Sequence, residues 1–277
     1  MTTTHVLNVP GARLYYEVRG TGPLLLIMAA PMAAAAFAPL AEALAGDHTV
    51  VTHDPRGISG STLDDPDQDS TPELRADDVA ALINALGAES ADVFGTSGGA
   101  VTGLALVARH CGRVRTLIAH EPPLLELLPE AAERRLWVED LIGTFHREGQ
   151  GPAWKDFLAA VGFDDSEDVQ AEPPSEPSAQ ALADGAHFFA HEIRGTTRYV
   201  PDIAALKAAP TRIIVGIGAD SGGLDTYRAS TALAQLLSTR PVEFPGDHAG
   251  FLARPQDFAT TLRAVLTGEG AYEPFTR

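Results

Sequence analysis

The sequence is poor in three features that would each point to a particular class of protein: cysteine, basic charge and long apolar runs. Cys111 is the only cysteine in a chain of 277 residues, so no internal disulfide can form. Lysine and arginine together number 20, against 37 aspartates and glutamates, which gives a formal net charge of −17. An acidic protein repels phosphate backbones, so we do not expect a nucleic-acid partner.

The apolar run LLLIMAAPMAAAAF, from Leu24 to Phe37, is the one candidate for a membrane segment. It is shorter than the roughly 20 residues that a spanning helix needs. Pro31 also interrupts it, and proline disfavours a continuous helix. We therefore expect no membrane partner. The first residues, MTTTHVLNVPGARLYYEV, show no basic segment followed by an apolar run, so we expect a cytoplasmic protein.

Short apolar segments alternate with helical patterns along most of the chain. This alternation predicts an α/β fold with a mostly parallel sheet and helices on both faces. After a hairpin over 5–19, the predicted strands are 24–28, 48–54, 90–95, 114–120, 211–218 and 240–246. The predicted helices of this region are 34–45, 71–86, 98–110, 227–237 and 255–266.

Residues 123–205 break this rhythm. They are helical in pattern and include an acidic, proline-rich stretch, FDDSEDVQAEPPSEPS at 163–178, which predicts a flexible loop. We interpret 123–205 as a helical cap that is inserted into a core made of residues 1–122 and 206–277.

The strongest functional signal is the turn GTSGG at 95–99, which matches the G-x-S-x-G pattern of a nucleophile elbow. A predicted strand precedes the turn and a predicted helix follows it, as an elbow requires. The glycines leave room for the neighbouring strand and helix, and the N-terminus of that helix favours a developing anion beside the serine. The pattern therefore predicts Ser97 as a nucleophile.

A serine nucleophile needs a base, and the base needs an orienting carboxylate. His248 lies in GDHAGF at 246–251, after a late strand and at the same edge of the sheet as Ser97. Asp220 follows the strand before that one, so the chain order Ser97, Asp220, His248 is the order typical of enzymes with this elbow. We predict His248 as the base and Asp220 as the acid, with Asp225 and Glu121 as open alternatives.

Together with GAD at 218–220 and HDPRGISGS at 53–61, these motifs make nearly the whole chain resemble the α/β-hydrolase-fold serine hydrolases, of the small capped esterase and haloperoxidase-like kind. The resemblance implies an eight-stranded sheet, a cap between the sixth and seventh strands, and hydrolysis of an ester, lactone, thioester or amide. It implies no metal and no organic cofactor. We expect a small, fairly apolar molecule as the substrate, and a monomer or homodimer as the assembly.

The resemblance also implies an oxyanion hole formed by the backbone N–H groups of Gly98 and of Ala30, in the loop MAAP at 28–31. Related loops carry histidine and glycine where this chain has Met28 and Ala29. Since alanine does not readily adopt positive φ, the loop has either kept its shape or shifted. A non-hydrolytic cyclase or acyl transferase therefore stays open as an alternative to hydrolysis. A catalytically silent protein that binds a small molecule in the pocket under the cap is a further alternative.

The substrate pocket is expected between the oxyanion loop and the cap. Met32 would form part of an apolar floor, and Trp154 and Phe188 would contribute aromatic surface from the cap. His187 and His191 are four residues apart and would share one face of a helix. They lack the H-E-x-x-H pattern and a third ligand, so we predict that they line the pocket and hold no metal.

Overall fold

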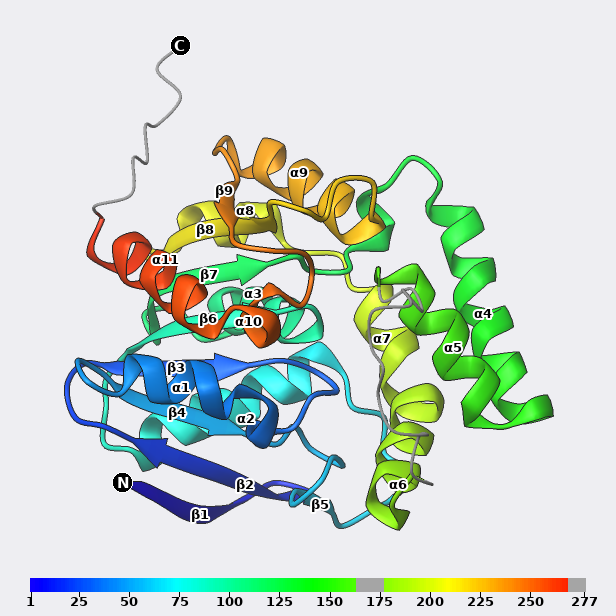
Figure 1. The fold of residues 1–277 in the computed structure, drawn as a ribbon, viewed down its shortest axis with the longest axis horizontal. Coiled ribbons are helices and arrows are strands. Elements are labelled where there is room, and N and C mark those ends of the chain that lie inside the picture. The colour runs from blue at the N-terminus through cyan, green and yellow to red at the C-terminus, as the bar shows by residue number, and fades with distance from the viewer. Residues whose placement is uncertain (163–176, 269–277) are drawn as a thin grey trace.

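The computed structural model describes residues 1–162 and 177–268. In these residues the strands form one sheet in the order β1-β2-β4-β3-β6-β7-β8-β9, and β5 pairs with β2 (Figure 1). The strands are β1 (Thr2–Val9), β2 (Ala12–Arg19), β3 (Leu24–Met28), β4 (Thr49–His53), β5 (Thr62–Leu63), β6 (Ala91–Thr96), β7 (Val114–His120), β8 (Arg212–Gly218) and β9 (Val242–Phe244). From β4 to β9 all neighbouring strands on this path are parallel, so the predicted α/β architecture is confirmed.

The sheet of the described residues has nine strands, whereas eight were expected, and the additional strand is β5. The missed strand has two residues, too few to show any periodic pattern. The helices are α1 (Ala38–Leu44), α2 (Pro72–Ala85), α3 (Gly98–Arg109), α4 (Ala131–Glu148), α5 (Gln150–Ala160), α6 (Ala179–His187), α7 (Ile193–Thr197), α8 (Ile203–Ala208), α9 (Asp225–Leu237), α10 (Gly250–Ala253) and α11 (Pro255–Thr267), with short 3-10 turns η1 (Ala34–Phe37) and η2 (Leu125–Leu127) and a π-helical turn η3 (Phe188–Glu192).

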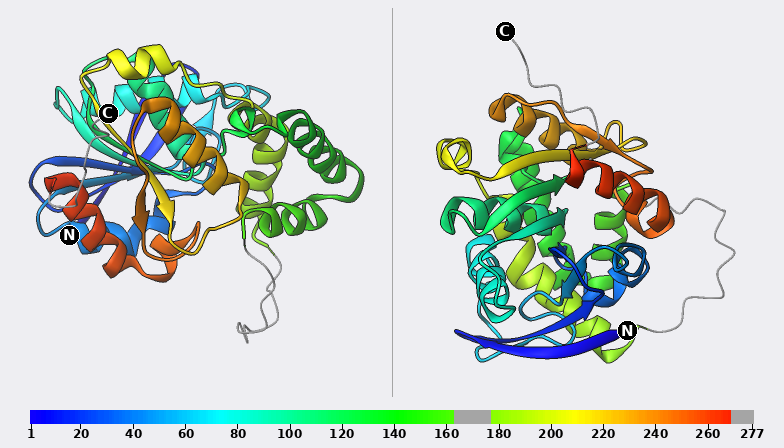
Figure 2. Two further views of the ribbon diagram at one scale, coloured as in Figure 1. Left: turned by 90° about the horizontal axis from the view of Figure 1, so that it is seen from above. Right: turned by 90° about the vertical axis from the view of Figure 1, so that its left-hand side faces the viewer.

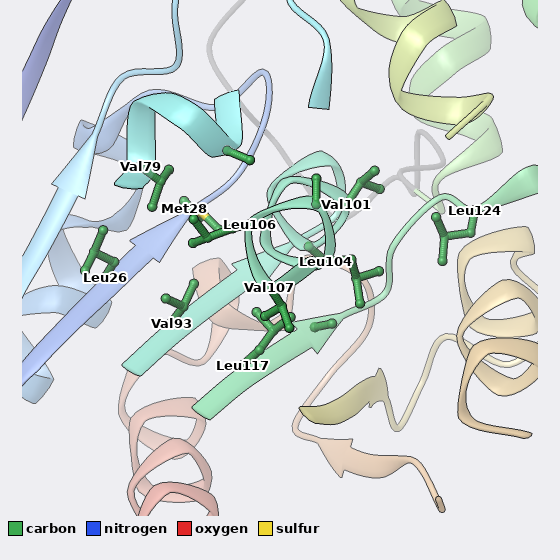
Figure 3. Close-up of a cluster of buried hydrophobic side chains, with 14 of the residues drawn as sticks. Leu26, Met28, Val79, Val93, Val101, Leu104, Leu106, Val107, Leu117 and Leu124 are labelled. Carbon is green, nitrogen blue, oxygen red and sulfur yellow. The ribbon is translucent and has the colours of Figure 1, made fainter. Parts of the chain in front are cut away.

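Two hydrophobic clusters lie on opposite faces of the sheet. In β3, Leu26 and Met28 belong to the cluster under α2 and α3, which Figure 3 shows, whereas Leu25 and Ile27 belong to the cluster under α1 and α11. Because both faces of this strand are covered, every position needs an apolar side chain. This explains why the run at 24–28 is continuous rather than alternating.

Helices α4 to α7, which we call the 131–197 segment, lie beyond the ends at which β3 and β7 finish (Figures 1 and 2). A backbone hydrogen bond from Ser70 N–H to the His191 carbonyl, at 3.0 Å, joins the segment to the rest of the fold. This is the position expected of a cap, although its limits at 123–205 stay a prediction. The predicted flexible loop at 163–178 falls mostly on residues 163–176, outside the described residues.

Within the described chain, no helix combines the length and the apolar character needed to cross a membrane.

The loop after β4 is fixed by buried charges. Asp54 accepts hydrogen bonds from the N–H groups of Ala34, at 2.7 Å, and Gly60, at 2.8 Å. Arg56 makes a two-pronged ion pair with Asp78 of α2, with N–O distances of 2.8 and 2.7 Å. Both side chains of this pair are buried, at 2% and 4% exposure. The pair therefore anchors the loop to α2.

Replacing Asp78 by asparagine should lower the free energy of unfolding by about 3–5 kcal/mol, because the buried Arg56 guanidinium loses its counter-charge. The neighbouring Asp77→Asn change removes an exposed pair with Arg109 and should cost no more than about 1 kcal/mol. Urea unfolding of both variants measures the difference. Equal losses would show that the Arg56–Asp78 pair does not anchor the loop.

Candidate active site

Ser97 sits in a strained turn between β6 and α3. Its φ of 52° and ψ of −126° lie in a region that residues other than glycine rarely adopt. A β-carbon added to Gly95 would lie 2.5 Å from the carbonyl oxygen of Gly99, so the turn tolerates only glycine there. The Ser97 N–H donates to the His120 carbonyl at 2.9 Å, which ties the turn to β7. The turn thus has the geometry of a nucleophile elbow.

The loop after β3 packs directly against this turn. A β-carbon on Gly98 would lie 2.6 Å from the Ala30 carbonyl oxygen, and one on Gly99 would lie 2.6 Å from the Ala29 Cα. Neither Ala29 nor Ala30 has positive φ, so alanine meets no backbone penalty at these positions. The peptide bond between Ala30 and Pro31 is cis. The loop therefore holds the backbone of Ala30 against Gly98 without the glycine that related loops carry.

His248 is oriented by Glu121. The distance from His248 Nδ1 to Glu121 Oε2 is 2.6 Å, and both side chains are buried, at 9% and 0% exposure. An ionised carboxylate can only accept a hydrogen bond, so Nδ1 of His248 carries the proton and donates the hydrogen bond to Glu121. This leaves Nε2 of the neutral imidazole unprotonated and able to take a proton from another group.

Glu121 follows β7, between the strands that precede Ser97 and Asp220. It has a positive φ of 47°, and its other carboxylate oxygen accepts from Gly218 N–H at 2.8 Å. Thr226 donates to Oε2 at 3.2 Å. Burial works against ionisation, but the hydrogen bonds from His248 and from the Gly218 N–H outweigh it and hold the pKa of Glu121 below its usual value.

The prediction that Asp220 orients His248 is wrong. Asp220 is exposed, and its side chain makes no hydrogen bond or ion pair with the described residues, although its backbone N–H donates to the Gly246 carbonyl. The alternative Asp225 is paired with Arg134 at 3.2 Å. Strand β7, which ends just before Glu121, lies next to β6, whereas β8, which precedes Asp220, lies one strand further away. Glu121, the weaker alternative by sequence, is the partner that the sheet brings to His248.

A second imidazole lies against His248. The ring centroids of His120 and His248 are 6.4 Å apart, with planes only 22° from parallel. His120 Nδ1 is 2.9 Å from Thr96 Oγ1, and its ring meets Phe244 and Phe258 edge-on. Burial is the main cause that lowers the pKa of His120 to about 3, so it stays neutral beside His248.

An apolar cavity of about 250 Å³ lies beside this arrangement. Its wall includes Thr226, which touches Glu121, together with Trp137, Phe157 and Ile193. A small apolar molecule or group fits such a wall.

The predicted pocket residues fall into different surroundings. Trp154 and Phe188 stack on each other, with centroids 5.2 Å apart, and pack inside the 131–197 segment. Met32 packs against the cluster under α1 and α11. His187 and His191 line a separate groove of about 520 Å³ beside Gly57 and β5. None of these five residues lines the cavity at Thr226, so their role as pocket residues stays a prediction.

Sequence reasoning missed a buried carboxylate in the 131–197 segment. Glu192 ends the π-helical turn η3 and has no solvent exposure. Burial, partly offset by the charge of Arg75, raises the pKa of Glu192 to about 7. The sequence around it, HFFAHEI, shows the glutamate on an aromatic helix face, which is the one signal that could have marked it.

In the part of the chain that the structure describes, no three side chains of histidine, cysteine, aspartate or glutamate meet in a way that could hold a metal ion.

The stability of a His53→Gln variant, compared with that of the wild type, should depend on pH. Burial, and to a lesser extent the charge of Arg75, lowers the pKa of His53 to about 4, whereas in the unfolded chain it is near 6.5. Below pH 6.5 the unfolded wild type gains a proton that the folded protein does not, so acidification destabilises it. As the pH falls from 7.5 to 5, the free energy of unfolding of His53→Gln should rise by about 2 kcal/mol relative to that of the wild type. Urea unfolding measures this gain, and the exposed His5→Gln should show none.

Comparison with known proteins places the chain in a family. The family model described as "Alpha/beta hydrolase family" matches residues 21–261. An uncharacterized hydrolase of Bacillus subtilis, YraK, is 34% identical over 270 residues, which is 95% of this chain and 96% of that protein. The zearalenone hydrolase of Bionectria ochroleuca is 24% identical over 275 residues, covering 94% of this chain and 96% of that one.

Solved structures agree on the fold. A thermophilic esterase from Thermogutta terrifontis superimposes with a TM-score of 0.75 at 21% identity, covering 97% of this chain and 98% of that one. An enol-lactonase from Burkholderia xenovorans gives a TM-score of 0.68 at 19% identity, covering 95% and 100%. The fold and the names of the sequence relatives both support a hydrolase. The chain has a mostly parallel sheet with a strained serine turn, and the family model matches most of its length. This chain therefore belongs to the alpha/beta hydrolase family.

Proposed function

We propose that this protein is a serine hydrolase that cleaves an ester, lactone or thioester bond in a small, fairly apolar molecule. One observation carries the proposal: a buried His248–Glu121 pair at the edge of the sheet where the strained Ser97 turn also lies. A nucleophile turn, a base with its proton fixed on one nitrogen, and a buried carboxylate are the parts that acyl transfer requires.

The first half of the reaction forms an acyl-enzyme. Ser97 Oγ attacks the substrate carbonyl carbon while His248 Nε2 takes the hydroxyl proton. Glu121 keeps the imidazole in the required tautomer and stabilises the imidazolium that forms. The tetrahedral intermediate then expels its alkoxide or thiolate, which receives the proton from His248. The acyl group remains on Ser97, and the alcohol or thiol leaves, except that the hydroxyl released from a lactone stays attached to the acyl group.

Water completes the cycle. His248 takes a proton from water, the resulting hydroxide attacks the acyl carbon, and the carboxylic acid leaves as Ser97 regains its proton. In both halves a negative charge develops on the carbonyl oxygen. We assign its stabilisation to the N–H groups of Ala30 and Gly98, because the two backbones touch at this point.

The non-hydrolytic alternative rests on the replacement of histidine and glycine by Met28 and Ala29. The backbone of Ala29 and Ala30 avoids positive φ, and the loop keeps its contact with Gly98 and Gly99. This observation favours hydrolysis. For the substrate, the cavity lined by Trp137 and Phe157 supports an apolar molecule, and zearalenone enters a first panel because one relative is named its hydrolase.

A fluorophosphonate probe should label the wild-type protein at Ser97, because the oxygen of an activated serine attacks phosphorus as it attacks a carbonyl carbon. Ser97→Ala should take no label, and His248→Ala should react at least about 100-fold more slowly because the base is lost. Intact-protein mass spectrometry follows the reaction. Labelling of wild type and His248→Ala at the same rate would contradict the proposal.

Glu121→Gln should lower kcat for ester hydrolysis by about 10³- to 10⁴-fold, because the amide no longer fixes the productive tautomer of His248. The matched change Asp220→Asn should leave kcat within about twofold, since that side chain is exposed. Steady-state kinetics on one activated ester compares the two variants. A larger loss in Asp220→Asn than in Glu121→Gln would reverse the assignment of the acid.

A further inference from the structure

A second group of ionisable side chains is buried between α2 and the 131–197 segment, away from Glu121 and His248. It consists of Arg75, His53, His187 and Glu192, with exposed fractions of 3%, 5%, 8% and 0%. We call it the Arg75 cluster. The charge of Arg75 contributes to lowering the pKa of each of the other three groups, so all three lie within its electrostatic reach.

Arg75 donates its hydrogen bonds to uncharged oxygen atoms. Its Nε donates to Thr102 Oγ1 at 3.0 Å and its Nη2 to Thr196 Oγ1 at 2.8 Å. Its Nη1 donates to the hydroxyl of Ser70, at 3.1 Å, and to the carbonyl of the same residue. Four of the five N–H groups of the guanidinium are thereby used, and none of them reaches Glu192.

Several polar atoms of the cluster have no partner among the described residues. These are both carboxylate oxygens of Glu192, Nδ1 of His53 and Nε2 of His187. Protein interiors rarely leave such atoms unsatisfied, and sites that do so commonly have a ligand or a functional role. Glu192 also ends a π-helical turn, a feature often found at functional sites.

The cluster lies one side chain away from the nucleophile turn. Thr102 Oγ1 accepts from Arg75 and donates to the Gly98 carbonyl at 3.0 Å. On its outer side, His187 is part of the wall of the 520 Å³ groove, where its Nε2 would lie 2.5 Å from a β-carbon on Gly57. The Arg75 cluster is therefore linked to the nucleophile turn through Thr102 and to the groove through His187.

The chemistry of these atoms selects a neutral ligand group. Burial first, then the charges of His191 and Arg75, lower the pKa of His187 to about 4, and His53 is similarly low, so both imidazoles are neutral. A neutral imidazole nitrogen either donates or accepts, and Glu192 accepts when ionised. An anionic group would face the Glu192 carboxylate with most of the Arg75 donors already engaged. A hydroxyl group, which donates and accepts at once, satisfies both kinds of atom.

We propose that the Arg75 cluster is a polar subsite that binds a hydroxyl group of the substrate through Glu192, so that the enzyme prefers hydroxylated esters or lactones. The inference rests on the proposed hydrolase function and deepens it. The hydroxyl would lie away from the scissile bond, since Arg75 is linked to the nucleophile turn indirectly, through Thr102.

The test uses two esters with the same leaving group: 4-nitrophenyl 3-(4-hydroxyphenyl)propanoate and its counterpart without the phenol hydroxyl. The wild type should favour the hydroxylated ester in kcat/KM by at least about tenfold, because a buried acceptor left unpaired disfavours the other ester. Glu192→Leu should bring this ratio close to one. Glu192→Gln, which keeps an acceptor oxygen, should retain part of it, and the exposed Glu133→Gln is the matched control with an unchanged ratio.

Binding keeps the inference separate from the hydrolase function. Calorimetry on Ser97→Ala compares the methyl esters of the same two acids, so it gives an answer even if the wild type hydrolyses neither nitrophenyl ester. That lack of turnover would overturn the proposed function alone. Tighter binding of the hydroxylated methyl ester, lost on adding Glu192→Leu or reduced on adding Glu192→Gln, supports the subsite. Equal binding of the two methyl esters, or a ratio that Glu192→Leu leaves unchanged, overturns it.

Discussion

The site depends on a contact between two stretches of backbone: the turn at 95–99 and the loop at 28–30. Because Gly98 and Gly99 lack side chains, the first turn of α3 settles directly on Ala29 and Ala30. That contact determines where the two candidate oxyanion N–H groups stand relative to each other. It also explains why the loop can carry alanine in place of the glycine of related loops, since the space is made on the α3 side.

Two buried glutamates show how their surroundings decide what a carboxylate can do. Glu121 receives hydrogen bonds from a backbone N–H, a hydroxyl and an imidazole, which favour its charged form despite burial. Glu192 is equally buried but receives none from the described residues, and burial raises its pKa to about 7. The surroundings of Glu121 therefore favour its charged form, whereas burial of Glu192 without a hydrogen-bond donor among the described residues favours its neutral form.

The sequence is most informative where a function is encoded locally. The Ser97 turn could be recognised from five neighbouring residues, and the position of His248 after a late strand placed it at the correct edge of the sheet. The partner of His248 could not be found in this way. Asp220 and Glu121 both follow strands, and the choice depends on side-chain reach across neighbouring strands, which no local pattern records.

The Arg75 cluster lay beyond sequence reasoning for a similar reason. Arg75 reads as a surface residue in the first turn of a helix, and its burial depends on the 131–197 segment folding back over α2. The aromatic residues of that segment were visible in the sequence. Their packing against one another, as in the Trp154–Phe188 stack, could not be predicted, because the sequence pattern does not distinguish residues packed between helices from residues that line a ligand pocket.

The contacts between the 131–197 segment and the rest of the fold limit how that segment can be exchanged between related proteins. Arg75 donates to Thr196, Ser70 N–H donates to the His191 carbonyl, and Ser59 N–H donates to Asp184, so both sides supply partners for buried or half-buried groups. A chimera that joined this core to a segment without Thr196 and Asp184 would remove acceptors of the Arg75 guanidinium and the Ser59 N–H. An exchange of the whole segment therefore has to preserve these contacts, whereas single substitutions elsewhere in the segment leave them in place.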